Sequence, residues 1–319
     1  MNRCVAFLFA LCCAFLSVSS ACIAQPTDWV HFTLEPSRGS SDLRADFRDE
    51  SKGRDHNNWS SSFRPSDLAG LDLAGFRASG TRPLRFAIVR EAGRLDCSGH
   101  GGESYAAGNC NLTPDPVFAR LLDSRGIGRP TREQAFGLIS LNVRRSLIDA
   151  VAAAHYPTPT IDNLMEMTAV GVDGRYIADL ARAGYRPSSV HHLVEFRAMN
   201  ITPEWIGGFA RMGYANLPAD ELVQLKALDI TADYVAGFHR LGYGRIPAED
   251  LVQLKALDVT PAYVAGFQRI GYARLPVDQL VQLKALDVTP EFAQWAIGQR
   301  GPLPPVSELV QMKIFDHRR

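Results

Sequence analysis

The chain has 319 residues and a formal net charge of zero, with 34 basic and 34 acidic side chains. This balance argues against the cationic excess with which proteins bind nucleic acids. At its start, Arg3 precedes an apolar run, and small residues surround a cleavage point after Ala24, so residues 1–24 predict a secretory signal peptide. What remains is long enough for two domains and has no later apolar stretch of membrane-spanning length, so we expect a periplasmic or secreted protein.

Cys22 offers an alternative N-terminus for the exported protein. The stretch SVSSAC resembles a lipoprotein cleavage box, although Ser19 stands where that box prefers leucine. Processing at this box would leave Cys22 as a lipid anchor, whereas cleavage after Ala24 would leave no anchor. The mass of the exported chain distinguishes the two products.

Residues 25–112 predict a small antiparallel β-domain. Apolar residues alternate with polar ones over 30–34 and again over 84–88, as in strands with one buried face. The stretch between them, 36–62, is polar and charged, and 63–73 predicts a short helix or turn. Without the leader only Cys97 and Cys110 remain, so we expect them to form a disulfide that closes the glycine-rich loop 98–109.

From Asp115 to about His317 the sequence repeats every 29 residues. The stretch LVQLKALDVTP stands at 251–261 and again at 280–290, and the repeat 260–288 can be stepped in both directions without a gap to give seven repeats. A period of this length is typical of stacked pairs of short elements. We therefore predict an α+β protein in which the β-domain is followed, over residues 113–319, by an α-solenoid of two-helix repeats.

Residues 260–288 show the two helices expected in each repeat. Thr260 suits the N-cap, Pro261 the first helical position, and Gly271 the left-handed residue after the first helix. The second helix, from about Pro276, is so apolar that we expect it to be buried on both flanks. Inside the first helix a glycine recurs, at a cost of about 1 kcal/mol relative to alanine, so we expect a close backbone approach there. These glycines are Gly208, Gly237 and Gly266.

Three residue sets suggest chemistry, and each has a structural explanation. His100, Gly101, Gly102 and Ser104 approximate an oxyanion loop and a nucleophile elbow, but an elbow needs a strand before it and a helix after it. The other two sets lack the spacing of the zinc motif HExxH and of calcium loops; they are His191, His192 and Glu195, and Asp42, Asp46, Asp49, Glu50, Asp55 and His56. We predict a protein that is not an enzyme and has no catalytic residue, metal or cofactor, with a hydrolase at Ser104 as an alternative.

Polar residues also recur at fixed positions of the repeat. They predict a surface that binds another protein of the cell envelope, although copies of ordinary surface residues would give the same pattern. The arginine row is Arg182, Arg211, Arg240 and Arg269; the glutamine row is Gln224, Gln253, Gln282 and Gln311; the lysine row is Lys226, Lys255, Lys284 and Lys313.

Several stretches together resemble a known family. They are WSSSF with DLAGL, RFAIVREAGRLDCSG followed by AAGNCNLTPDPVF, and the repeated LDVTPxYVxxF. The combination is similar to the extracytoplasmic C-terminal region of bacterial antirepressor metallopeptidases of the β-lactam sensor-transducer type, over nearly the whole mature chain. The peptidase part and its zinc motif have no counterpart in these 319 residues, so no catalytic residue is carried over. The resemblance implies an envelope module that binds or senses, and a sensor of small molecules or cell-wall fragments is therefore the second candidate.

Overall fold

The computed structural model describes residues 29–49 and 57–315. The predicted signal peptide and Cys22 lie outside these residues. Contacts divide the chain into two units: the β unit (up to Ser66, 70–86 and 97–112) and the helical unit (67–69, 87–96 and from Thr113 on). None of the described helices combines the length and apolar character that a membrane crossing requires.

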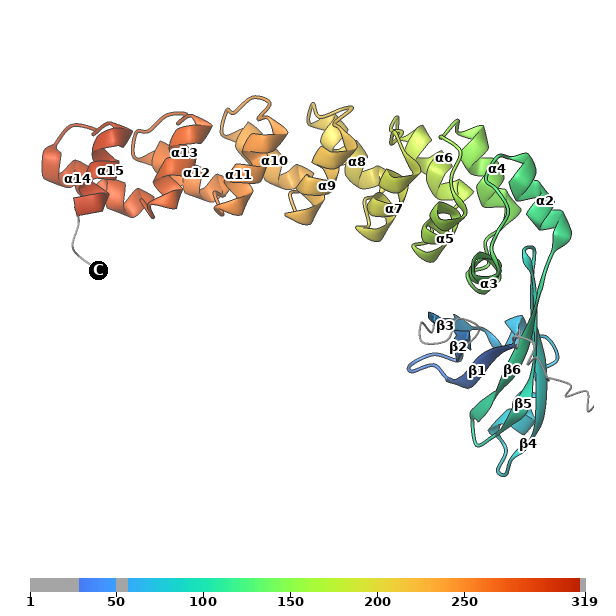
Figure 1. Cartoon of the computed structure of the whole chain (residues 1–319). Coiled ribbons are helices and arrows are strands. Elements are labelled where there is room, and N and C mark those ends of the chain that lie inside the picture. Colours follow the sequence, from blue (N-terminus) through green and yellow to red (C-terminus); the bar gives the residue numbers. More distant parts are fainter. Residues whose placement is uncertain (1–28, 50–56, 316–319) are drawn as a thin grey trace, which may run out of the picture. The chain divides into compact units, whose positions relative to one another are not determined.

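The described strands form one six-stranded antiparallel sheet (Figure 1). They are β1 (Trp29–Pro36), β2 (Leu43–Asp49), β3 (Asn57–Phe63), β4 (Arg82–Arg90), β5 (Gly93–Gly102) and β6 (Tyr105–Pro114). Their order across the sheet is β3-β2-β1-β6-β5-β4. Between β3 and β4 the chain forms η1 (Pro65–Asp67) and α1 (Leu73–Arg77), where the sequence predicted a short helix or turn.

Alternate residues of the strands build the core of the β unit. Val30, Phe32 and Leu34 of β1 are buried, as the alternation predicted. The ring of Phe32 meets that of Phe86 edge-on, with the centroids 5.0 Å apart, although β6 and β5 separate their strands in the sheet. The sheet therefore curls so that its inner face closes on itself.

Two strands of the β unit were not assigned from the sequence, and one expectation for this unit was wrong. The polar stretch 36–62 contains β2 and most of β3. In β2 the buried residues Leu43, Ala45 and Phe47 alternate with charged residues that reach solvent. The glycine-rich stretch 98–109 is not a loop, because β5 and β6 run through it and turn only at Glu103 and Ser104. Both of these residues have positive φ, 54° and 64°, as a tight two-residue hairpin turn requires.

The predicted disulfide is confirmed. Cys97 on β5 and Cys110 on β6 are bonded, with their Cα atoms 3.9 Å apart, and both side chains are buried. A disulfide of this kind persists in oxidising compartments.

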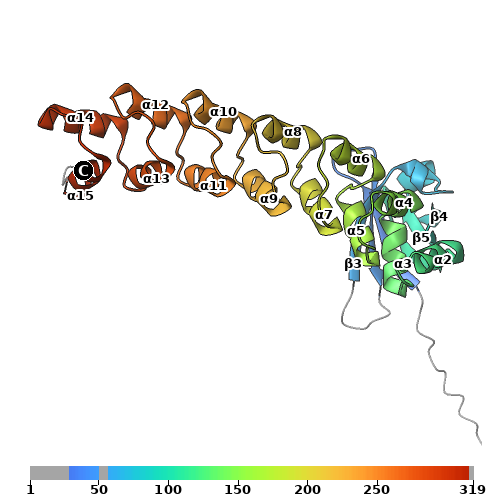
Figure 2. The same cartoon turned by 90° about the horizontal axis from the view of Figure 1, so that it is seen from above.

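Residues 115–315 form seven helix pairs in the described part of the chain, in the predicted 29-residue register. Figure 2 shows most even-numbered helices in one row and the odd-numbered ones in another. Contacts join each odd-numbered helix to the next odd-numbered one, and they join most neighbouring even-numbered helices. The even row is α2 (Pro116–Ser124), α4 (Arg145–Ala153), α6 (Gly174–Arg182), α8 (Pro203–Arg211), α10 (Ala232–Arg240), α12 (Pro261–Arg269) and α14 (Pro290–Arg300). The odd row is α3 (Arg132–Ser140), α5 (Ile161–Ala169), α7 (Val190–Ala198), α9 (Ala219–Ala227), α11 (Ala248–Ala256), α13 (Val277–Ala285) and α15 (Val306–Phe315).

Local signals set the ends of these helices. At α12 the Thr260 hydroxyl accepts a hydrogen bond from the Tyr263 amide at 3.1 Å, and Pro261 takes the first helical position. After the helix Gly271 has a φ of 103°, which glycine adopts without steric cost. The boundaries that the sequence predicted for the first helix are therefore confirmed.

The second helix of each repeat is less buried than its composition suggested. In α13 only Leu280 and Leu283 are fully buried, while Gln282 and Ala285 are exposed. Its neighbours α11 and α15 cover it on both flanks, as predicted, so the exposed strip lies on the remaining side of the helix. Each odd-numbered helix from α5 to α13 thus keeps a strip of surface open to solvent.

Tyrosine hydroxyl groups link each repeat to the next. Burial raises the pKa of Tyr185 and of Tyr272 to about 12, so their hydroxyls stay protonated and donate. Each bond goes to a backbone carbonyl 32 residues later, at 2.6–2.7 Å: Tyr185 to Leu217, Tyr214 to Ile246, Tyr243 to Leu275, and Tyr272 to Pro304.

The recurring glycines mark the closest approach between even-numbered helices. A Cβ atom on Gly237 would lie 2.4 Å from Cγ of Pro261, and one on Gly266 would lie 2.5 Å from Cγ of Pro290. Gly208 is less crowded because an alanine, Ala232, faces it. A Cβ atom on Gly208 would lie 3.2 Å from Cβ of Ala232. The glycine makes room for the proline that starts the next even-numbered helix, so the predicted close approach is confirmed.

We expect Gly237→Ala to lower the free energy of unfolding of the helical unit by about 1–3 kcal/mol, because overpacking outweighs the gain in helix propensity. Adding Pro261→Ala should restore most of the loss, since this reproduces the alanine that faces Gly208. Urea unfolding of the single and double variants measures the coupling. Gly207→Ala is the matched control: its Cβ would make only an ordinary contact, 3.7 Å from Nη1 of Arg211, so the variant should be as stable as the wild type or more so. Equal stability of Gly237→Ala and Gly207→Ala would contradict the packing argument.

Candidate functional site

The predicted rows of polar residues lie on different parts of the helical unit. The arginine row occupies the last turn of the even-numbered helices, and all four side chains are exposed. The glutamine and lysine rows lie on the odd-numbered helices, which form the other row in Figure 2. The arginines therefore do not form one surface with the glutamines.

The arginine row has acidic neighbours. Arg182 is hydrogen-bonded to Asp179 on the same helix. The pKa of Glu291 is lowered by hydrogen bonds from its own backbone amide and from Thr289, with a smaller contribution from the charge of Arg269. At these two positions the positive charge is partly balanced within the unit.

The lysines contact aromatic rings in their own repeats. The ammonium nitrogen of Lys284 lies 5.1 Å from the centre of the Tyr263 ring, and it also lies 3.8 Å from a carboxylate oxygen of Asp258. The same stacking recurs with an aromatic residue 21 positions earlier: Lys226 on Trp205, Lys255 on Tyr234 and Lys313 on Phe292. The lysine row thus takes part in packing within the repeat, which sequence analysis missed.

The glutamine row is exposed and has no hydrogen-bond partner among the described residues. On α5 to α13 the residue four positions before this position and the alanine three positions after it share its side of the helix. We call this strip the glutamine face. It has three rows: Asp162, His191, Asp220, Glu249 and Asp278; Glu166, Glu195, Gln224, Gln253, Gln282 and Gln311; and Ala169, Ala198, Ala227, Ala256 and Ala285. All these side chains are exposed except that of Glu195, which is half-buried.

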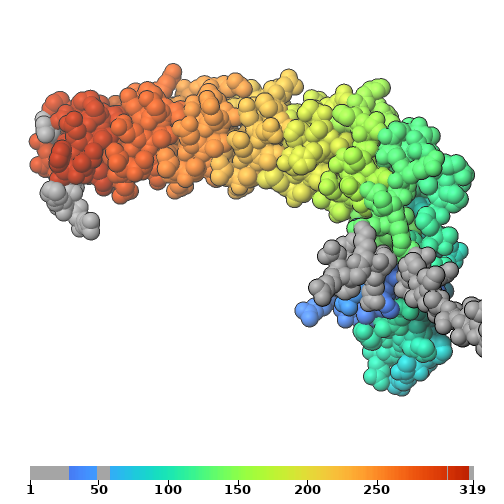
Figure 3. Space-filling model, viewed as in Figure 1, coloured from blue at the N-terminus to red at the C-terminus, as the bar shows by residue number. Residues whose placement is uncertain are grey.

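The glutamine face is acidic. Glu249 and Asp278 form no ion pair with any described residue, and Asp220 contacts the His192 ring at 3.3 Å. Acidic residues in the first turn of a helix also interact favourably with the helix dipole, which accounts for their position but not for the amides that follow them. The space-filling view shows that successive repeats pack against one another without gaps (Figure 3).

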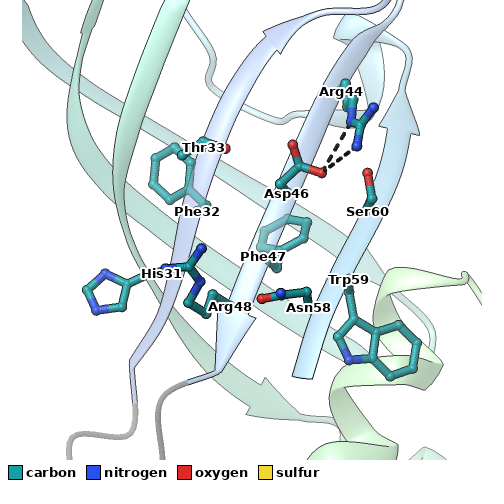
Figure 4. Close-up of a pocket in the computed structure, with 10 residues that line it drawn as sticks. All are labelled: His31, Phe32, Thr33, Arg44, Asp46, Phe47, Arg48, Asn58, Trp59 and Ser60. Atoms are coloured by element: carbon teal, nitrogen blue, oxygen red, sulfur yellow. Dashed lines mark hydrogen bonds and ion pairs between the residues drawn. The ribbon is translucent and has the colours of Figure 1, made fainter. Parts of the chain in front are cut away.

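The β unit carries a second candidate site, an open groove of about 620 Å³ on β1, β2 and β3. Strand pairing places His31, Arg48 and Asn58 in one cross-strand row. Figure 4 shows the next row, where Asp46 accepts hydrogen bonds from Arg44 at 3.1 and 3.2 Å. Arg48 has no ion-pair partner among the residues that the structure describes, so this groove offers an available cation beside polar side chains.

The other predicted chemistries have different surroundings. Ser104 lies in the hairpin turn, where its backbone amide donates to the Phe76 carbonyl at 2.9 Å, and a strand rather than a helix follows it. No hydrogen bond joins it to His100 within the described part of the chain. The nucleophile-elbow geometry is therefore not present at Ser104.

His191 and His192, which were considered for a metal, have protein partners. Nε2 of His191 lies 3.4 Å from Oε1 of Glu195, and Nδ1 of His192 lies 3.1 Å from the Ser189 hydroxyl oxygen. Residues 29–49 and 57–315 contain no group of three or more histidine, cysteine or carboxylate side chains placed to hold a metal. Of the calcium candidates, Glu50, Asp55 and His56 lie outside these ranges.

Comparisons with family models, with curated proteins and with solved structures gave no match for this chain.

Proposed function

We propose that the chain is an exported, non-enzymatic binding module of the bacterial cell envelope, and that its helical unit binds a segment of another protein along the glutamine face. The observation that carries this proposal is the row of exposed glutamines, whose amides make no hydrogen bond to the described protein. Packing accounts for three other recurring polar groups: the tyrosines link repeats, the lysines stack on rings, and the threonines cap helices. The arginine row is exposed too, and it lies on the even-numbered helices. The glutamines have no such role, so they are free to serve a partner.

Two further observations support an envelope location. The disulfide between Cys97 and Cys110 suits an oxidising compartment. The resemblance of the sequence to the extracytoplasmic region of antirepressor metallopeptidases of the β-lactam sensor-transducer type implies the same location. The chain would act there without the peptidase part.

Site-specific photocrosslinking tests the proposal. A benzophenone amino acid replaces Gln253 or Gln282 on the glutamine face, Arg240 on the even-numbered helices, or Ser60 in the groove of the β unit. In cells that export the full chain, positions 253 and 282 should give the same discrete adduct, because the partner lies along the row. Adducts from Arg240 alone would move the site to the arginine row, and absence of adducts at 253 and 282 would refute the proposal.

The groove on β1–β3 supports the second candidate function, a sensor of small anionic molecules or cell-wall fragments. Arg48 is the observation that favours it, because guanidinium groups bind carboxylates through paired hydrogen bonds. Calorimetric titration with a muropeptide should then show binding that Arg48→Ala abolishes and that Gln253→Ala leaves unchanged. Equal heats for the wild type and Arg48→Ala would exclude the groove.

A further inference from the structure

We infer that the segment bound on the glutamine face is a basic peptide in the polyproline II conformation, lying across the odd-numbered helices. This inference rests on the proposed function and specifies its ligand. Three properties of the face support it: the spacing of the glutamines, the chemistry of their amides, and the charge of the row beside them.

The spacing of the rows selects the ligand's conformation. Neighbouring odd-numbered helices pack directly on each other, so equivalent residues repeat at about the 8–10 Å that separates packed helix axes. A polyproline II helix presents the same side every three residues, or about 9.3 Å. A β-strand presents the same side about every 6.7 Å, so it would fall out of register after one repeat. A polyproline II segment can therefore meet Gln224, Gln253 and Gln282 with equivalent groups.

The amides select a ligand with unpaired backbone groups. A glutamine side chain offers two N–H donors and one carbonyl acceptor. A polyproline II segment has no internal hydrogen bonds, so its carbonyls are available to those donors, whereas an α-helix uses its own. The exposed alanines Ala227, Ala256 and Ala285 end at Cβ, which lets a ligand backbone approach the helices beside the amides.

The charge of the face selects basic side chains. Glu249 and Asp278 lie one turn before Gln253 and Gln282 on the same side of their helices, and neither has an ion-pair partner among the described residues. In the repeats before the glutamines, Glu166 and Glu195 take the equivalent position and extend the acidic surface. The lysines of the same helices do not cancel this charge locally, because they stack on rings at the helix ends.

Fluorescence anisotropy with a labelled (Lys-Pro-Pro)5 peptide tests the inference on the mature chain. We expect saturable binding that weakens with added salt, and no binding of (Glu-Pro-Pro)5. The triple change Gln224→Ala, Gln253→Ala and Gln282→Ala should weaken binding at least about tenfold, the equivalent of about 1.4 kcal/mol. The helix content of the variant, measured by circular dichroism, should match that of the wild type, because the changed residues are exposed.

Neutralising acidic residues on each row of helices provides a matched pair of variants. Glu249→Gln with Asp278→Asn should weaken binding of (Lys-Pro-Pro)5, whereas Glu204→Gln with Asp233→Asn, on the even-numbered helices, should leave it unchanged. Failure of (Lys-Pro-Pro)5 to bind, or equal binding by the glutamine triple variant, overturns the inference. If the ligand is not a basic polyproline II peptide but the proposed function holds, the photocrosslinks at positions 253 and 282 would still form. The inference about the ligand and the proposed function can therefore fail separately.

Discussion

Changing Phe238 and Phe267 together to alanine is expected to unfold the fifth and sixth repeats of the helical unit. Both rings are completely buried, and each lies edge-on between two tyrosines of its own repeat. Truncating a buried phenylalanine typically costs about 3–5 kcal/mol, and a whole domain is stable by only about 5–15 kcal/mol. Urea unfolding followed by far-ultraviolet circular dichroism should show most of the cooperative helical transition lost.

Exposed residues of the same helices provide the control. Arg240→Ala with Arg269→Ala should shift the free energy of unfolding by no more than about 0.5 kcal/mol for each change. Hydrogen exchange should locate the loss in the phenylalanine variant to residues 231–288 and the repeats next to them, because solenoid repeats are stabilised by their neighbours. A phenylalanine variant with the unfolding midpoint of the arginine variant would contradict the packing described for the even-numbered helices.

Removing the disulfide should destabilise the β unit. Cys97 and Cys110 close a short loop between two buried positions, and the loss of such a cross-link costs about 2–4 kcal/mol. Cys97→Ala with Cys110→Ala keeps the positions apolar, so the change isolates the bond. Tryptophan fluorescence, to which Trp29 and Trp59 contribute from the β unit, should report unfolding at lower urea concentration.

The helical unit serves as the internal control in the same sample. The far-ultraviolet transition, which the helices dominate, should keep its midpoint in the cysteine variant. Wild-type protein treated with reductant should behave as the variant does. Alkylation of both thiols in the untreated exported protein would show that no bond forms, and this prediction would then fail.

The architecture of the helical unit could be predicted because its signals are local. Thr260, Pro261 and Gly271 act on residues within a few positions of themselves, and the repetition of this pattern fixed the seven helix pairs. In the β unit the same approach missed β2, because the charged residues between Leu43, Ala45 and Phe47 hid the alternation. Strand pairing depends on residues far apart in the sequence, which local patterns do not report.

The candidate site was predicted only in part for the same reason. The periodicity identified the rows, but it did not show which residues the fold already uses. The stacking of Lys255 on Tyr234 joins two helices of a repeat, and only their packing reveals it. The groove around Arg48 likewise depends on the register of β1, β2 and β3, which no motif in the sequence encodes.

The glycine–proline and tyrosine–carbonyl contacts have a consequence for evolution. Each of the repeats 202–230, 231–259 and 260–288 supplies a glycine and a tyrosine to the repeat that follows, and receives the tyrosine of the repeat before it on a backbone carbonyl. If residues 231–259 were deleted, Gly208 would face Pro261, and the Tyr214 hydroxyl would reach the Leu275 carbonyl, as Gly237 and Tyr243 do now. Unequal recombination between the stretches that encode these nearly identical repeats can therefore lengthen or shorten this protein by whole repeats, and the junctions it creates between them already fit.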